Sequence, residues 1–317
     1  VFGAMSGVAL ALGPILGGAL VDGFGWRAIF WVNVPIVVGA IVAAALFVPE
    51  SRADRARRFD PVGQALVAVV LGCVVFPIIE SERWGWASPV VLGPLAVAAL
   101  GVLAIRWYEP RRADPLLELR LFRSVPFSSA ILMAVFALGG FSAFLFVTTL
   151  YLQNVRGLPA LTAGLCLLPV GVLIVLLAPV AGRWVGRHGP RLPLVVAGAA
   201  LALGGAASLG LGPTTTLPAV LGTFALFGVA LGTVNPPITN SAVSGMPPAM
   251  TGLAASVASA GRQTGTTLGV AIAGTIVGSA STGAAFTTAE HGVWWLVLAL
   301  GAGILALGLL STRRRDA

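Results

Sequence analysis

The sequence predicts an all-α integral membrane protein with about ten transmembrane helices. Hydrophobic residues make up 57% of its 317 residues, and the mean hydropathy is +0.97. Charged residues make up only 9%, against roughly 25% in soluble domains. The uncharged stretches are long as well, since no ionisable side chain occurs between Leu192 and Gly261, and one bilayer-spanning helix needs about 20 apolar residues. These observations exclude a soluble fold.

Charged or Pro/Gly-rich segments separate ten predicted spans. The spans cover residues 1–21, 29–48, 61–80, 88–108, 125–151, 161–182, 191–211, 217–237, 250–278 and 292–311. A long, charged, proline-bearing loop over 109–124 separates a pair of spans from a block of six. The sequence opens inside an apolar run without the basic start of a signal peptide. We therefore expect a fragment that lacks the N-terminus of a longer protein.

Arginine supplies all 19 basic residues and gives a formal net charge of +8. The arginines gather in alternate loops, over 49–60, 109–124, 183–191 and the tail 312–317, whereas the other loops hold only Arg27, Arg83 and Arg156. Short loops rich in arginine are retained on the cytoplasmic side, so we expect the C-terminus in the cytoplasm. Because the arginines lie in short loops and not on one face, no nucleic-acid partner is expected.

Tryptophans mark the predicted outer ends of the spans, where amphipathic rings sit at the level of the lipid headgroups. They are Trp26, Trp31, Trp84, Trp86, Trp294 and Trp295.

The sequence gives no sign of a cofactor, a metal site or an enzyme. Cys73 and Cys166 lie inside apolar runs, as packing residues do. His188 and His291 fall in predicted loops with no second ligand at metal spacing. No phosphate-binding loop and no catalytic triad pattern can be assembled. An ATP-driven mechanism is therefore not expected.

The first span contains the run ALALGPILGG, whose small residues Gly13 and Gly17 share one helix face. A neighbouring helix can approach such a face closely, and Pro14 bends the helix by removing a backbone donor. A lone pair of glycines at this spacing is equally typical of ordinary helix packing. The composite with Pro14 and Gly18 resembles the antiporter signature in the fifth helix of major facilitator drug exporters. The residues that follow also match that family's passage into its sixth helix: Trp26, Arg27, Phe30, Asn33 and Pro35.

The ninth span combines a stripe of small residues, Gly261, Gly265 and Gly269, with a polar stretch. A charge within a span is costly and normally faces a cavity or a partner. Arg262 is therefore the main candidate for a functional residue, with Gln263 and Thr266 beside it in a polar lining. The alternative is that Arg262 extends to lipid phosphate at the cytoplasmic end.

The loop after the sixth span reads GRWVGRHGPR and resembles the second copy of the facilitator cytoplasmic loop motif. Its motif residues are Gly182, Arg183, Arg187, Gly189 and Arg191. Gly186 stands at the acidic position of that motif, so the charge relay of the first copy is not carried over. A plain positively charged turn is the alternative.

Two further candidates lie at span ends. Asn235 precedes the consecutive prolines Pro236 and Pro237, which predict a helix end at a gate or, alternatively, a substrate contact. Tyr151, at the outer end of the fifth span, lines a vestibule in one interpretation and anchors the helix at the interface in the other.

Nearly the whole chain resembles the drug:proton antiporters with fourteen spans, of the EmrB/QacA type. The resemblance implies a major facilitator fold: 1–48 as the last two helices of the N-terminal bundle, 49–124 as a linker with an inserted helix pair, 125–311 as a complete C-terminal six-helix bundle, and 312–317 as a cytoplasmic tail. It also implies a monomer in the bacterial plasma membrane that exports small hydrophobic or cationic compounds against proton entry.

Alternatives remain open at this point. One is a facilitator that exports an amino acid or an endogenous natural product, and another is a non-transporting membrane scaffold. Proton coupling needs an ionisable group inside the membrane, but the acids of this chain, such as Asp22, Glu80 and Glu82, fall at predicted span ends or in loops. We therefore expect the coupling carboxylate outside this chain.

Overall fold

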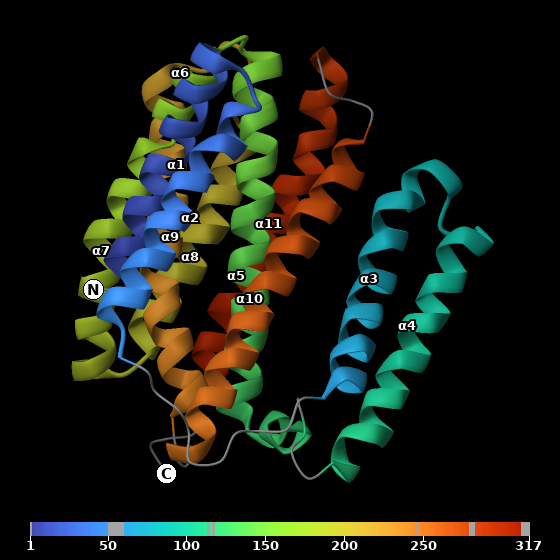
Figure 1. The fold of residues 1–317 in the computed structure, drawn as a ribbon. Helices are drawn as coiled ribbons and strands as arrows, with labels where there is room; N and C mark the ends of the chain where they lie inside the picture. The colour runs from blue at the N-terminus through green and yellow to red at the C-terminus, as the bar shows by residue number, and fades with distance from the viewer. Residues whose placement is uncertain are drawn as a thin grey trace.

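The computed structural model describes residues 2–49, 60–112, 115, 118–244, 246, 248–278 and 283–311. All regular structure in these ranges is helical, and Figure 1 shows long, roughly aligned helices. The long helices are α1 (Phe2–Phe24), α2 (Ala28–Phe47), α3 (Pro61–Trp84), α4 (Pro89–Tyr108), α5 (Val125–Leu150), α7 (Leu168–His188), α8 (Arg191–Ser208), α9 (Leu217–Val243), α10 (Pro248–Val277) and α11 (Gly283–Ser311). The short elements are η1 (Glu109–Arg111), η2 (Leu119–Arg123), the π-helix η3 (Tyr151–Val155) and α6 (Ala160–Cys166).

Among the described residues, 8 helical segments are long and apolar enough to cross a membrane. In three of them a short element extends the long helix, because η1 follows α4, η3 continues α5 and α6 leads into α7. The chain is therefore a multi-pass membrane protein, and the predicted all-α fold class is confirmed. The arginines of 50–59 and of the tail 312–317, on which the predicted orientation partly rests, lie outside the described residues.

Three predicted boundaries are wrong. Helix α9 runs through Pro236 and Pro237 to Val243, because freed backbone groups inside a bundle can find other partners. Helix α7 continues to His188, so most of the predicted loop after it is helical. Helix α11 begins at Gly283 and not near Gly292, which places Glu290 and His291 inside a helix. The tight turn after α7 is made by Gly189, whose φ of 78° favours glycine.

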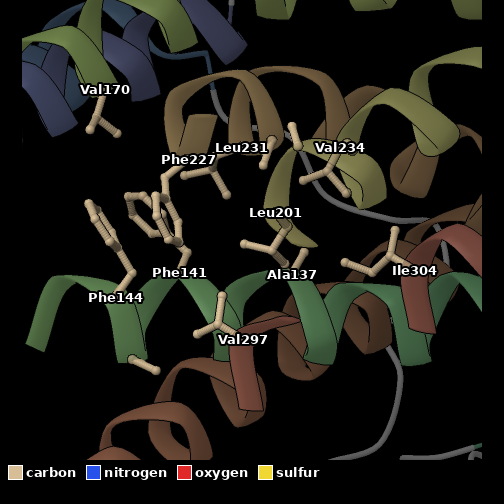
Figure 2. Close-up of a cluster of buried hydrophobic side chains, with 14 of the residues drawn as sticks. Ala137, Phe141, Phe144, Val170, Leu201, Phe227, Leu231, Val234, Val297 and Ile304 are labelled. Carbon is tan, nitrogen blue, oxygen red and sulfur yellow. The ribbon is translucent and has the colours of Figure 1, made fainter. Parts of the chain in front are cut away.

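One continuous apolar core joins helices α5 to α11 (Figure 2). At its centre Phe144 stacks on Phe227, with ring centroids 3.8 Å apart, and Trp294 lies 6.4 Å from Phe227. Trp294 is 1% exposed. The Trp294 ring therefore packs inside the bundle and does not face lipid. The other five interface tryptophans are exposed.

The glycine stripe of α10 is the face that packs on α5. A Cβ on Gly269 would overlap the carbonyl oxygen of Gly139, and a Cβ on Gly265 would lie 2.8 Å from the Cα of Val135. The hydroxyl of Ser142 donates to the carbonyl oxygen of Thr266 across the same contact, at 3.0 Å. Only glycine permits this close approach of two helix backbones.

Helices α3 and α4 form a hairpin beside the bundle, next to α10 (Figure 1). The hydroxyl of Thr275 on α10 donates to the carbonyl oxygen of Ile78 on α3, at 2.7 Å. At the other end of α3, the carboxylate of Asp60 caps the helix by accepting from the N–H of Gly63 at 3.0 Å, and it also accepts from the Tyr108 hydroxyl at 3.1 Å. The hairpin is thus tied to the bundle at one end and closed on itself at the other.

Candidate functional site

The motif-bearing helix α1 packs closely on α6 and α7. A Cβ on Gly18 would lie 2.5 Å from the carbonyl oxygen of Ala160, and a Cβ on Gly164 would overlap the carbonyl oxygen of Pro14. Gly18 is therefore the close-contact glycine of α1, and its partner carries a glycine of its own. Gly13 and Gly17, which were predicted to share the packing face, have no atom within 4 Å of an added Cβ. Asp22 adds a polar tie, because its carboxylate accepts from the N–H of Leu161 at 2.9 Å.

A cavity of about 260 Å³ lies beside this contact, between α1, the end of α5 and α6–α7. Its wall is mostly apolar, with the hydroxyl of Thr149 and the amide of Gln153 as its polar side chains. The lining residues are Pro14, Gly17, Gly18, Val21, Thr149, Leu152, Gln153, Ala160, Ala163, Gly164 and Leu167. Three of the four predicted motif residues of α1 thus line one cavity, while Gly13 is exposed with nothing near it.

Tyr151 does not line this cavity. It is 1% exposed, and its hydroxyl donates to the carbonyl oxygen of Gly212 at 2.7 Å. The neighbouring Arg156 donates to the carbonyl oxygen of Thr215 at 2.8 Å. The two bonds hold the π-helical end of α5 against the α8–α9 loop, so the Tyr151 side chain serves the bundle's internal packing.

The second group of predicted residues lies on α10, on the side away from α5. Ser256, Ser259, Gln263 and Thr267 recur at helical spacing and are exposed, while the buried glycine stripe faces the opposite way. Arg262 and Thr266 are half-buried at the edge between the two faces. In the described part of the chain, helix α10 is not among the segments apolar enough to cross a membrane by composition. A helix with one such polar face, packed in a membrane protein, is typical of a wall that meets water or another polar helix.

The hydroxyls on this face are bonded to their own helix. Thr266 donates to the carbonyl oxygen of Arg262 at 3.1 Å, and Thr267 donates to that of Gln263 at 3.0 Å. Such hydroxyls tolerate an apolar neighbour. The exposed amide of Gln263 and the guanidinium of Arg262 are the groups that require a polar environment.

The comparisons with known proteins assign the family. The model of the Major Facilitator Superfamily matches residues 1–270, which is most of the chain. This chain belongs to the Major Facilitator Superfamily. It is a member of a transporter family and not of an enzyme family.

Relatives of this facilitator chain are named for drug resistance, export or efflux. The chain is 35% identical over 274 residues to the multidrug resistance protein Stp of Mycobacterium tuberculosis, covering 86% of the chain and 51% of Stp. It is 36% identical over 280 residues to the tetracenomycin C resistance and export protein of Streptomyces glaucescens, with the same two coverages, 86% and 51%. It is 31% identical over 266 residues to the multidrug efflux pump LfrA of Mycolicibacterium smegmatis, covering 84% of the chain and 53% of LfrA. The facilitator chain thus spans about half the length of these relatives.

The remaining predicted residues of this facilitator lie apart from the cavity. Gly182, Arg183 and Arg187 are exposed on the last turns of α7, and Arg191 opens α8. Asn235 is half-buried within α9, two turns before its end. The structure does not bring these residues together with the polar face of α10 or with the cavity at α1.

Sequence reasoning missed one acidic side chain in this facilitator. Glu290 lies within α11 and is 1% exposed. The expectation that all acids of the chain lie at span ends or in loops is therefore wrong. The segment TGAAFTTAEHG resembles a polar loop, but Phe286, which is 0% exposed, anchors it to the bundle as helix. A buried aromatic one turn before Glu290 was the available signal.

Proposed function

We propose that this facilitator takes part in proton-coupled export of small hydrophobic or cationic drugs across the bacterial plasma membrane. Its relatives Stp and LfrA are named for multidrug resistance and efflux. We place the chain in a fourteen-span, monomeric transporter with a cytoplasmic C-terminus. In it, 1–48 end the N-terminal bundle, 49–124 form the linker, 125–311 form the C-terminal bundle and 312–317 form the tail.

The contact between α1 and α6–α7 is the observation that carries this proposal. At Gly18 and Gly164 the backbones of α1 and α6 pack directly on each other. The cavity of about 260 Å³ lies beside this contact. An apolar wall with few polar groups suits ligands that are themselves largely apolar. In the proposed cycle, the separation of α1 from α6 opens the cavity to one side of the membrane. The glycines then allow the two helices to pack closely again and close the cavity.

The polar face of α10 forms part of the same proposed pathway. Gln263 offers an amide, and Arg262 at the edge of the face offers a guanidinium that repels cations unless an acid neutralises it. We propose that Gln263 contacts substrate and that the charge of Arg262 sets the electrostatic potential along the pathway. Thr266 and Asn235 are proposed to line the pathway without a dominant role in binding. The loop residues Gly182, Arg183, Arg187, Gly189 and Arg191 are proposed to hold the cytoplasmic gate.

Export of a natural product made by the same organism is the second candidate function. One relative is a resistance and export protein for tetracenomycin C, and nothing in the cavity at α1 distinguishes a drug from such a compound. An efflux assay that compares synthetic dyes with a panel of natural products decides between the two functions.

The test uses the gene in its native reading frame, expressed in a bacterial strain without its main efflux pumps. We expect lower ethidium accumulation than in the empty-vector strain and a return to the vector level when a protonophore collapses the proton gradient. Gly18→Leu is expected to abolish export, because the added side chain would overlap the backbone at Ala160.

Gly23→Leu is the matched control on the same helix, since no atom lies within 4 Å of its added Cβ. It should export as well as the wild type. If the wild-type and vector strains accumulate ethidium, and every other dye and natural product tested, to the same level, transport is refuted and a scaffold is favoured. Export that survives the protonophore would refute proton coupling alone.

A further inference from the structure

Three buried polar side chains in the C-terminal bundle have atoms without partners. Thr148, Glu290 and Trp294 are each 1% exposed. The hydroxyl oxygen of Thr148, the Oε2 of Glu290 and the Nε1 of Trp294 have no hydrogen-bond partner. Buried polar atoms in native proteins are nearly always bonded, so three such atoms together require a physical explanation.

The three side chains lie at one end of the aromatic group in the core. Helices α5 and α11 are antiparallel, because Phe136 on α5 contacts Gly303 on α11 whereas Phe144, further along α5, meets Trp294 through Phe227. Thr148 lies one turn beyond Phe144, and Glu290 lies one turn before Trp294. Residues four apart share a helix face, so both side chains extend the same contact toward the same end.

The charged and titratable groups at this end have other partners. On α11, the Nε2 of His291 lies 3.1 Å from the carbonyl oxygen of Leu209. From α5 and η3, the hydroxyl of Tyr151 donates to the carbonyl oxygen of Gly212, and the guanidinium of Arg156 donates to that of Thr215. Glu82 of α3 lies against Gly278 at the end of α10. Among the residues that the structure describes, the nearby ends of α8 and α9 carry no charged side chain, and their hydroxyls at Ser208 and Thr223 bond their own helices.

We propose that Glu290 is a proton-binding site inside the C-terminal bundle, formed together with Thr148 and Trp294. A carboxylate buried inside an apolar helical bundle without a cation beside it is costly to keep charged. Binding one proton from water removes the charge and leaves a carboxyl that accepts from the indole N–H and donates to the threonine hydroxyl. The proton returns to water when α11 separates from α5 and α8.

This inference deepens the proposed function, on which it rests for its role in export. It assigns a proton-binding group to this chain and to a helix contact that has to loosen for the proton to leave. Release of the proton would then require α11 to move, which is how proton release can be coupled to a conformational change of the transporter.

Infrared difference spectroscopy tests the site without any substrate. The protein is purified from its native reading frame, placed in lipid vesicles and titrated from neutral to alkaline pH. We expect a carbonyl band of a protonated carboxylic acid that disappears as the pH rises and that is missing from Glu290→Gln. Glutamine is neutral and of similar size, so this variant should keep the packing of the bundle; a monodisperse gel-filtration peak checks that.

Two further variants make the assignment specific. Thr148→Val keeps the shape of the side chain and removes the hydroxyl, so it should shift the position of the band. Glu82→Gln removes an exposed carboxylate and should leave the band as it is. A band that is equal in wild type and Glu290→Gln, or absent from wild type at neutral pH, would overturn the proposal.

The efflux assay separates this inference from the proposed function. Glu290→Gln is expected to lose the pH dependence of export, because its side chain cannot release a proton. Proton-linked export by a wild type that shows no Glu290 band would sink the proton site and leave the proposed function standing. A clear Glu290 band in a protein that exports nothing would support the proton site and refute the proposed function.

Discussion

Helices α2 and α5 are equally apolar, yet they have opposite surroundings. Their spans have mean hydropathies of 2.3 and 2.4, but 0% of the α2 span and 61% of the α5 span is buried. No residue of α2 is buried in the described part of the chain, whereas α5 contacts α9, α10 and α11 and has many buried residues. Apolarity therefore identifies helices that cross a membrane but does not identify their packing partners.

The small residues of the two helices have different surroundings. On α5, Gly139 and Ser142 meet the glycine stripe of α10. On α2, Gly39 has no atom within 4 Å of an added Cβ. Within a membrane, helices associate through close packing and not through their apolarity, since lipid is apolar too. The α5–α10 contact is thus where this fold is most sensitive to added volume.

The largest effect is expected from Gly265→Leu. Its added Cβ would lie 2.8 Å from the Cα of Val135, and backbone cannot move aside as a flexible side chain can. Overpacking typically costs about 1–3 kcal/mol, and it costs more where, as here, backbone blocks the added side chain. We expect most of the protein to aggregate during extraction, and the remainder to unfold at a lower temperature, as measured by fluorescence-detected gel filtration after heating.

Gly252→Leu is the control on the same helix, because no atom lies near its added Cβ. It should behave as wild type. If both variants lost the same amount of folded protein, the added apolar side chain itself would explain the loss and close packing against Val135 would not.

A smaller loss is expected when the aromatic core is cut. Phe227→Ala removes a ring that is 0% exposed and stacked on Phe144, and such a truncation costs about 3–5 kcal/mol when the cavity does not collapse and less when it does. The thermal midpoint in detergent should fall clearly. Phe47→Ala, at the 81% exposed end of α2, should leave the midpoint unchanged, and an equal fall in both would contradict the contrast between the two regions.

The sequence predicted the helices well because span length, uncharged runs and arginine-rich loops are local signals. The helix ends were less predictable, because they are decided by contacts that the sequence does not display. Pro236 and Pro237 remain helical inside a packed bundle, and the segment before Gly292 is helical because Phe286 is buried. In both places tertiary packing overrides local preference.

The candidate site was predictable in part. The motif marked α1 as a helix that another helix approaches closely, but the close contact is at Gly18 and not on the predicted face of Gly13 and Gly17, which have no atom within 4 Å of an added Cβ. The partner glycine, Gly164, and the cavity residue Gln153 were beyond sequence reasoning, since nothing local says which distant helix meets α1. Glu290 was missed for a related reason: its burial follows from the start of α11, which had been set too late.

The smallest effect is expected at the base of the α3–α4 hairpin, which is held by polar contacts where the bundle is held by apolar ones. The N–H of Gly63 donates to the Asp60 carboxylate, and the Tyr108 hydroxyl and the nearby Arg112 charge also favour its ionised form. Together they hold the pKa of Asp60 below its usual value. A lowered pKa in the folded state means that Asp60 stabilises the hairpin at neutral pH and that this stabilisation is lost as the pH falls through the lowered pKa.

Asp60→Ala is therefore expected to speed amide hydrogen exchange in the first turn of α3 at neutral pH, while α5 to α11 exchange as in the wild type. At acid pH, below the lowered pKa of Asp60, the two proteins should exchange alike in this turn, because the wild-type carboxylate is then protonated. Ser88→Ala, which removes the cap of α4 at the hairpin's other end, should change only the first turn of α4 and show no such pH dependence. If Asp60→Ala instead speeds exchange throughout the bundle, the hairpin base and the bundle fold as one unit and the contrast between polar and apolar regions does not hold.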